Sequence, residues 1–277
     1  MKMKNIQTEA TLEPSTVMEK SDNKEIIEVE SPRPTVQEWA HTSWNPYTGC
    51  TRTSPGCAHC WADRMTQRLW KGKPGYPKDN PFNLAFHPDR MDRNYARHPA
   101  REREPQRILV CSMSDLFHDG IPFEHVEMIF NELAEIDHHN YLVLTKRSER
   151  MMELASRLPW PDHICASVSL ENADYVYRID HLRKTPAAVK ILFVEPLLGP
   201  LPHLNLGGIH QVVVGGESGP GARPMEPDWV RDIRDQCIDA GVPFFFKQWG
   251  GGIRSLRGHE LDGRTWSEWP DKMKVID

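Results

Sequence analysis

The chain has 277 residues, of which 39% are hydrophobic and 26% charged. A chain of this size and composition can bury a sizeable core, which excludes wholesale disorder, collagen and coiled coil. The absence of an 18-residue apolar run or an apolar leader predicts a cytoplasmic protein with no membrane partner. Because the net charge is -5, any contact with nucleic acid must come from a locally basic face.

The chain divides into three regions by composition. Residues 1–36 are rich in Glu, Lys, Ser, Thr and Pro, contain no aromatic residue, and end in two closely spaced prolines, which predicts a disordered tail. A partner-binding arm is the alternative for this tail. Residues 37–252 form the predicted main domain, and 253–277 form an extension expected to pack outside it through Trp266 and Trp269.

From Trp39 onward, β-branched or aromatic runs alternate with amphipathic stretches, a pattern typical of repeated βα units. We therefore expect an α/β fold, a complete or partial (β/α) TIM-type barrel. The eight expected strands are 41–48, 82–86, 108–112, 141–145, 164–169, 191–194, 211–215 and 244–247. The expected helices are 61–70, 123–136, 148–157, 172–184 and 227–240.

Polar side chains follow nearly every expected strand. In this fold the catalytic and binding residues lie at the carboxyl ends of the strands. The recurrence of polar side chains there favours a shared site over a set of separate caps and turns. These residues are His87, Asp89, Ser114, Asp115, Lys146, Arg147, Glu171, Asn172, Glu195, Glu217, Lys247 and Gln248.

Three of the six cysteines, Cys50, Cys57 and Cys60, lie within eleven residues between the first expected strand and the first helix. In a reducing cytoplasm such thiols serve metals or catalysis more often than disulfides. Gly49 and Gly56 let the backbone fold tightly enough for the thiolates to converge. A metal centre with three protein ligands keeps one position open for a substrate or cofactor.

This cysteine segment and six others together resemble a phage and prophage family of unassigned function that carries a three-cysteine motif and is similar to radical S-adenosylmethionine (SAM) enzymes. The matching segments are 44–62, 112–117, 144–147, 168–172, 194–199, 215–219 and 246–250. The resemblance implies a radical SAM-like barrel in which Cys50, Cys57 and Cys60 hold a [4Fe-4S] cluster. SAM would bind the fourth iron and yield a 5′-deoxyadenosyl radical that abstracts hydrogen from an unknown substrate.

The resemblance also implies an electron donor and a partner protein associated with the three-cysteine motif. Two features depart from the radical SAM pattern: six residues separate Cys50 from Cys57 where three are usual, and His59 replaces the aromatic residue before the third cysteine. Two alternatives therefore stay open. One is a zinc site completed by His59 or His87 in a binding or adaptor protein, and the other is a set of free thiols.

Under the radical SAM reading, the rim residues divide into cofactor-binding and catalytic groups. Lys146 or Arg147 would pair with the SAM carboxylate. A carboxylate at Glu195 would bind a substrate amine or form an ion pair with Lys247. The expected cofactor-binding residues are Ser114, Asp115, Lys146, Arg147, Ser169, Glu171, Asn172, Gly215 and Gly216, and the expected catalytic residues are Glu217, Glu195 and Lys247.

Basic residues concentrate between Arg64 and Arg107, with Trp70, Tyr76 and Tyr95 among them. Basic and aromatic side chains together suit a surface that tracks phosphates and stacks bases, so a nucleic acid or nucleotide is a candidate substrate. A solvated insertion between two strands explains the same composition. On the first interpretation, Arg90, Arg93 and Arg97 would contact phosphates.

Overall fold

The computed structural model describes residues 39–252 and 258–273, which belong to one compact unit, Pro34–Asp277. The predicted N-terminal tail lies outside the described residues. None of the described helices is long and apolar enough to cross a membrane.

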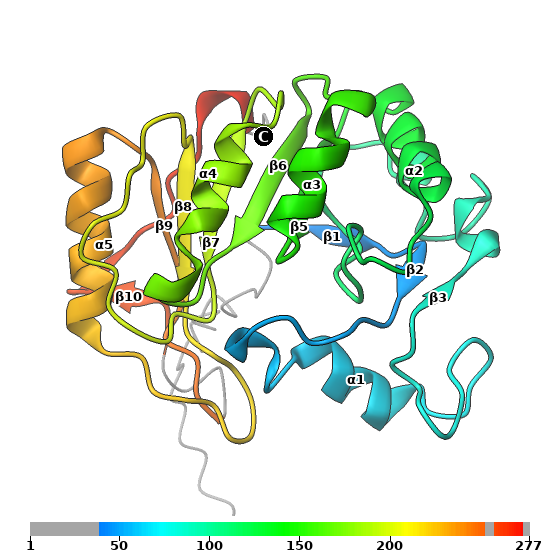
Figure 1. Cartoon of the computed structure of the whole chain (residues 1–277), viewed down its shortest axis with the longest axis horizontal. Helices are drawn as coiled ribbons and strands as arrows, with labels where there is room; N and C mark the ends of the chain where they lie inside the picture. Colours follow the sequence, from blue (N-terminus) through cyan, green and yellow to red (C-terminus); the bar gives the residue numbers. More distant parts are fainter. Residues whose placement is uncertain (1–38, 253–257, 274–277) are drawn as a thin grey trace, which may run out of the picture. The chain divides into compact units, whose positions relative to one another are not determined.

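Seven parallel strands form the main sheet, in the order β1-β4-β5-β6-β7-β8-β9. The sheet curls into a half-barrel, which confirms the partial barrel expected from the sequence (Figure 1). The strands are β1 (Thr42–Trp44), β4 (Arg107–Val110), β5 (Asn140–Thr145), β6 (Ile164–Ser169), β7 (Lys190–Val194), β8 (Gln211–Gly215) and β9 (Phe244–Gln248).

Four helices follow strands β4, β5, β6 and β8 and cover the outer face of the sheet (Figure 1). They are α2 (Phe123–Glu135), α3 (Ser148–Leu154), α4 (Tyr177–Arg183) and α5 (Pro227–Ala240). Helix α5 begins at a proline and ends at Gly241, whose φ of 64° lies in the left-handed region that glycine adopts without strain. Helix α1 (Trp61–Leu69) instead lies across the carboxyl ends of the strands.

The second expected strand, 82–86, is wrong as a member of the main sheet. Only Ala85–Phe86 is extended, as β3, and it pairs antiparallel with β2 (Tyr47–Thr48). At the start of the segment, the Phe82 carbonyl accepts a hydrogen bond of 3.2 Å from the Cys50 amide. The sheet therefore has seven strands where eight were expected.

Alternating strand residues face two separate hydrophobic clusters. Val212 and Val214 pack toward the helices, whereas Val213 packs toward the opposite face, which we call the inner face. The inner face continues at Phe193 and Phe245 on the neighbouring strands β7 and β9. Glu195, Gly215 and Lys247 lie together at the carboxyl end of this face, because Lys247 contacts both Glu195 and the Trp39 ring and a Cβ atom at Gly215 would lie 3.2 Å from Glu195.

The C-terminal segment follows the free edge of β9. A short hairpin, β10 (Glu260–Leu261) and β11 (Arg264–Thr265), leads into residues whose backbone pairs with β9, where the Phe246 amide donates to the Trp266 carbonyl at 2.9 Å. Trp269 then packs edge-on against Phe245 of the inner face, with ring centroids 5.8 Å apart. The segment thus covers the edge of the sheet and part of its inner face.

Candidate metal centre

The cysteine loop, residues 49–60, leaves β2 and enters α1 at the carboxyl rim of the half-barrel (Figure 1). Its first residues are fixed to the turn after β4, because the Gly49 amide donates to the Met113 carbonyl at 2.9 Å and the Ser114 hydroxyl donates to the Gly49 carbonyl at 2.6 Å. At Gly49 a Cβ atom would lie 1.9 Å from the Asn83 carbonyl oxygen, so only glycine fits. Ser114, expected to bind a cofactor, therefore holds the loop.

Cys50, Cys57 and Cys60 are all half-buried and free of disulfides. The three residues line one pocket of about 220 Å³, together with Asp63 and Gln67 of α1 and residues 80 and 82–84. The structure therefore brings together the three cysteines that the sequence singled out.

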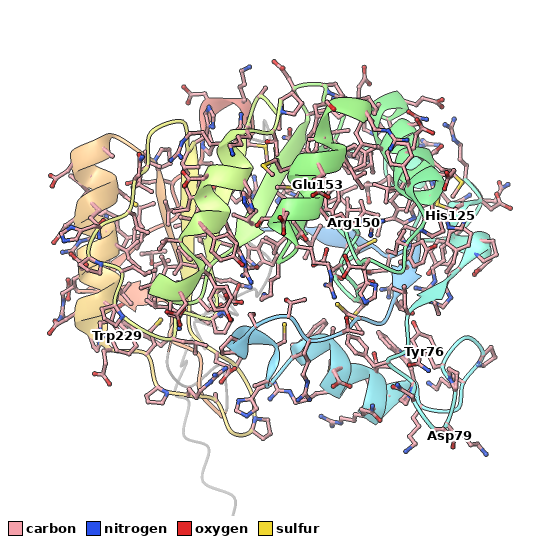
Figure 2. All side chains as sticks on the ribbon, viewed as in Figure 1. Tyr76, Asp79, His125, Arg150, Glu153 and Trp229 are labelled. Carbon is pink, nitrogen blue, oxygen red and sulfur yellow. The ribbon has the colours of Figure 1, made fainter. Side chains whose placement is uncertain are left out.

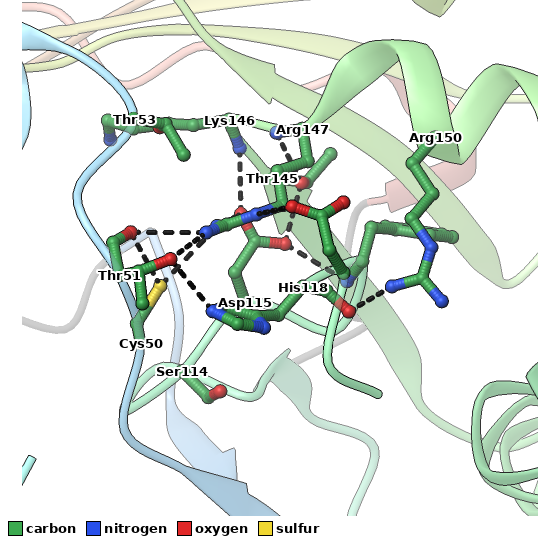
Figure 3. A network of polar contacts seen from close by, with 12 residues as sticks. Cys50, Thr51, Thr53, Ser114, Asp115, His118, Thr145, Lys146, Arg147 and Arg150 are labelled. Carbon is green, nitrogen blue, oxygen red and sulfur yellow. Dashed lines mark hydrogen bonds and ion pairs between the residues drawn. The ribbon is translucent and has the colours of Figure 1, made fainter. Parts of the chain in front are cut away.

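Asp115 fixes the beginning of the cysteine loop through Arg147 (Figure 3). The buried carboxylate accepts hydrogen bonds from the Thr145 hydroxyl at 2.6 Å and the Lys146 amide at 3.1 Å, and it pairs with the Arg147 guanidinium at 3.3 Å. The same guanidinium donates to the Thr51 carbonyl at 3.1 Å and to the Cys50 sulfur at 3.4 Å. The charge and the hydrogen-bond donors of Arg147 are thus engaged by the Asp115 carboxylate and by the cysteine loop.

Glu171 fixes the middle of the cysteine loop. Its carboxylate has no exposure to solvent, pairs with the equally buried Arg178 at 2.9 Å, and accepts a hydrogen bond of 2.5 Å from the Ser54 hydroxyl. Gly56 packs directly against it, since a Cβ atom there would lie 2.6 Å from the Glu171 side chain. Lys146 completes the surroundings, with its ammonium group 3.9 Å from the carboxylate.

Glu217 fixes the end of the cysteine loop. It accepts hydrogen bonds from Arg223 at 2.6 and 3.0 Å and lies 2.9 Å from a ring nitrogen of His59, which stands between Cys57 and Cys60. Arg223 also donates to the Pro55 carbonyl at 2.8 Å. Although burial raises it, the pKa of Glu217 is lowered to about 2, because these hydrogen bonds and the Arg223 charge outweigh the burial.

A further contact joins helix α1 to the same region. The Arg64 guanidinium donates to the carbonyls of Ser218 and Pro220, and at Gly219 a Cβ atom would collide with it. Arg64 therefore ties the first turn of α1 to the loop after β8.

Asp115, Glu171 and Glu217, which we call the rim carboxylates, share one arrangement. Each follows an alternate strand of the sheet, namely β4, β6 and β8, and each is less than a tenth exposed. Each also pairs with one arginine and contacts the cysteine loop, directly or through that arginine. The loop is therefore held at three points along the rim before any metal is considered.

Four other expected cofactor-binding residues also contribute to packing or caps. Ser169 is buried at the end of β6, and the Asn172 side chain accepts the Asp174 amide at the start of a short 3₁₀ turn. A Cβ atom at Gly215 would lie 2.9 Å from Gln248, and one at Gly216 would lie 2.1 Å from a backbone carbonyl. Close approach of the backbone therefore requires glycine at 216, whereas at 215 the near atoms belong to the Gln248 and Glu195 side chains.

The inner face carries a second polar group at the same end of the sheet. Lys247 donates to both Glu195 oxygens, at 2.9 and 2.7 Å, and its ammonium group lies 4.2 Å from the centre of the Trp39 ring. Gln248 donates to the same carboxylate at 2.7 Å. The sequence left two roles open for Glu195, and the structure shows the ion pair with Lys247.

Cys50 and Cys57 of the cysteine loop differ electrostatically. Burial raises the pKa of the Cys50 thiol to about 11, and the nearby charge of Asp115 adds to this effect. Burial also raises the pKa of Cys57, but the positive charge of Lys146 and local hydrogen bonds outweigh it, so the net direction is downward. Lys146 therefore favours a thiolate at Cys57.

Three cysteines around one pocket are the candidate ligands of a metal centre. Within residues 39–252 and 258–273, no three His, Cys, Asp or Glu side chains are placed to hold one metal ion together. A cluster would impose another requirement, because each thiolate binds its own iron and the sulfurs need not converge on one point. None of the other described cysteines lines this pocket.

The two histidines suggested as a fourth zinc ligand have other partners. His59 is paired with Glu217, and His87 is buried and hydrogen-bonded to the Thr48 hydroxyl at 2.7 Å. Neither His59 nor His87 lines the pocket that the three cysteines share.

Sequence reasoning missed two of the residues that support the rim carboxylates. Arg178 lies within α4, where an arginine normally indicates an exposed surface, and Ser54 is separated from Glu171 by 117 positions. A third supporting residue, Arg223, lies only six residues after Glu217, and this short separation was the signal available in the sequence.

The basic stretch 64–107 is divided by the fold. Arg90 donates to the Asn45 carbonyl and the Tyr76 hydroxyl, and Arg93 pairs with Glu132 of α2 at 2.7 Å. These two arginines are engaged within the protein, which weakens the hypothesis that they track phosphates.

The fold and site define a protein with a parallel half-barrel whose carboxyl rim holds a three-cysteine loop. The chain belongs to the DUF5131 family of proteins of unknown function, whose profile matches residues 34–270. Among curated proteins there is no significant match.

Two solved structures show similarity in chain arrangement. Spore photoproduct lyase in complex with dinucleoside spore photoproduct matches with 12% identity and a TM-score of 0.42, and a mutant of spore photoproduct lyase matches with 13% identity and a TM-score of 0.40. Each match covers 70% of this chain and 60% of the other protein.

Proposed function

We propose that the protein is a radical SAM-type iron–sulfur enzyme that acts in phage or prophage biology. The observation that carries the proposal is the set of three free cysteines around one pocket, on a loop fixed to alternate strand ends of a parallel half-barrel. The resemblance of the sequence motifs to radical SAM enzymes supports the same conclusion.

Cys50, Cys57 and Cys60 would hold the [4Fe-4S] cluster, and the cluster with SAM would supply a 5′-deoxyadenosyl radical for hydrogen abstraction. The chain's own residues position and protect this chemistry. The rim carboxylates and their arginines fix the loop. Of the two basic residues, Lys146 is the better partner for the SAM carboxylate. Arg147 is already engaged by Asp115 and Thr51, whereas the Lys146 ammonium group lies near Cys57 and makes one longer contact, 3.9 Å, with Glu171.

The substrate would bind over the inner face, where Glu195 and Lys247 offer a carboxylate and an ammonium group side by side. Such a pair can bind a group that both donates and accepts hydrogen bonds, which a nucleotide base edge does. A nucleotide or nucleic acid therefore remains our candidate substrate class, with Glu195 and Lys247 as its contacts.

Anaerobic reconstitution tests the metal. We expect about four irons per chain and the broad visible absorbance of a cluster, both lost in Cys57→Ala. Cys237→Ala, at a buried cysteine on α5 far from the loop in sequence, is the matched control and should keep its iron. Stoichiometric zinc without iron uptake would contradict the proposal and favour the zinc-binding adaptor.

A second measurement tests SAM. The reduced protein should release 5′-deoxyadenosine slowly without a substrate, and Lys146→Ala should weaken SAM binding about tenfold, as expected for a lost charged hydrogen bond. Lys184→Ala, an exposed lysine on the helix side, is the control. Equal affinity in the two variants would show that Lys146 does not contact SAM.

A further inference from the structure

Helix α1 presents an apolar stripe to solvent beside the cysteine loop. Trp61 is 54% exposed and Leu69 is 43% exposed, and the half-buried Met65 lies between them at helical spacing. A neighbouring face of the helix is buried through Ala62 and Thr66. An exposed apolar stripe on a helix that already buries another face indicates a contact surface.

The surroundings of this stripe are basic although the protein is acidic overall. Six Lys or Arg and only two Asp or Glu lie between Arg52 and Asp79, whereas the whole chain carries a net charge of -5. Arg68, Lys71 and Lys73 are exposed beside Leu69. The positive charge of this region therefore attracts an acidic partner, whereas the net negative charge of the whole chain repels it.

The stripe begins at the residue after Cys60, so whatever docks there lies next to the proposed cluster. We propose that the exposed side of α1, with Arg68, Lys71 and Lys73, is the docking surface for an acidic one-electron donor protein. The inference rests on the proposed function. The donor loses one electron, the cluster gains it and passes from the 2+ to the 1+ state, and no bond or proton moves.

An acidic protein fits this surface better than a nucleic acid. A single-stranded nucleic acid needs several exposed aromatic side chains for successive bases. Here Trp70 and Tyr76 pack on each other with ring centroids 5.3 Å apart, and Tyr76 is 7% exposed, which leaves Trp61 as the exposed aromatic of α1. An apolar stripe with a basic border instead matches the core and rim of a protein interface.

The experiment compares two reductants on the reconstituted holoenzyme. The variants are Leu69→Asp and the pair Arg68→Glu with Lys71→Glu, chosen because they lie two turns or more from Cys60. The matched controls are Ile238→Asp, at an exposed apolar position on α5, and Lys184→Glu. Cluster reduction is followed by the loss of visible absorbance, first with dithionite and then with a flavodoxin reduced to its hydroquinone.

We expect the flavodoxin-dependent rate to fall about tenfold or more in both α1 variants, with a flatter dependence on salt, while the dithionite rate and the controls stay unchanged. Equal flavodoxin rates in the α1 and control variants would overturn the docking surface. Failure of dithionite to reduce any cluster would instead overturn the proposed function.

Binding measured without electron transfer distinguishes a failure of the docking surface from a failure of the proposed function. Calorimetry of oxidised flavodoxin against the same variants should show weaker binding only for the α1 variants, and unchanged binding would count against the surface. A single-stranded oligonucleotide is titrated in parallel. If the α1 variants lose the oligonucleotide and keep flavodoxin, the surface belongs to nucleic acid and the proposal is wrong.

Discussion

The two polar groups at the carboxyl rim differ in what they hold. The rim carboxylates are nearly fully buried, and each contacts the cysteine loop directly or through its arginine. The Glu195–Lys247 pair lies on the inner face, keeps 24% of the Glu195 side chain exposed, and contacts Gln248 and the Trp39 ring. Polar residues at one rim thus fall into two groups: the rim carboxylates hold the cysteine loop, and the Glu195–Lys247 pair lies on the inner face, where we propose that the substrate binds.

This difference changes the role of Glu217. The sequence alone suggested a catalytic carboxylate, but the observed carboxylate is saturated by Arg223 and His59. A carboxyl group whose pKa is about 2 is a poor proton acceptor at neutral pH. We therefore propose that Glu217 positions the cysteine loop, while Glu195 and Lys247 remain the expected catalytic residues.

Breaking the most buried rim pair should have the largest effect. Arg178→Met leaves the Glu171 charge without its arginine in a site of 0% exposure, so we expect a loss of about 3 kcal/mol in the free energy of unfolding. Urea denaturation at pH 7 measures it. Lys272→Met, which removes an exposed pair with Asp162, should cost less than about 1 kcal/mol. Equal losses would mean that the buried pair has no special role.

Glu217→Gln should cost somewhat less and should reveal itself by pH. A carboxyl whose folded pKa lies below its ordinary value of 4.5 stabilises the fold fully above that value, and the stabilisation disappears as the pH falls toward about 2. We expect a loss of about 2 to 3 kcal/mol at pH 7 that shrinks between pH 4.5 and 2.

Unfolding of wild type and variant at several pH values checks this prediction. Glu153→Gln, at an exposed glutamate on α3, is the matched control (Figure 2). A Glu217→Gln loss that stays constant down to pH 2.5 would contradict the assignment. Iron content should also fall in Glu217→Gln, because His59 of the cysteine loop loses its carboxylate partner.

The smallest effect is expected on the inner face. Lys247→Met leaves Glu195 partly solvated and still bonded to Gln248, so the free energy of unfolding should change by about 1 kcal/mol or less. Iron content and 5′-deoxyadenosine release without substrate should match the wild type. Loss of iron comparable to that in Glu217→Gln would erase the distinction between the two groups.

Local patterns predicted most of the fold because helices and strands are encoded within about ten residues. The spacing of Val126, Ile129, Phe130 and Leu133 gives α2 its buried side, and the alternation in β8 gives the sheet its two faces. The prediction for 82–86 was wrong because its composition suits a strand of the main sheet, whereas the Phe82 carbonyl bonds to Cys50 of the cysteine loop and Ala85–Phe86 pairs with β2. Composition does not encode these long-range contacts.

The location of the site was predictable, but the partners within it were not. The ends of the strands can be recognised in the sequence, so Asp115, Glu171 and Glu217 could be assigned to one rim. Their arginines come from three different structural contexts: a strand-to-helix turn, the body of a short helix and a loop. No periodicity distinguishes Arg178 from an exposed arginine, and only the folded chain shows that it is 1% exposed.

The cysteine loop crosses the rim from the turn after β4, which holds Gly49, to Glu217 after β8, which holds His59. From β4 to β8 the sheet advances by four strands, about 19 Å at the ordinary separation of roughly 4.8 Å. The ten steps from Gly49 to His59 reach about 34 Å when fully extended, at roughly 3.4 Å each, and a loop three residues shorter would reach about 24 Å. The additional residues therefore leave room for the 3₁₀ turn Pro55–Cys57 within the loop, whereas a shorter loop would have to cross the rim nearly extended.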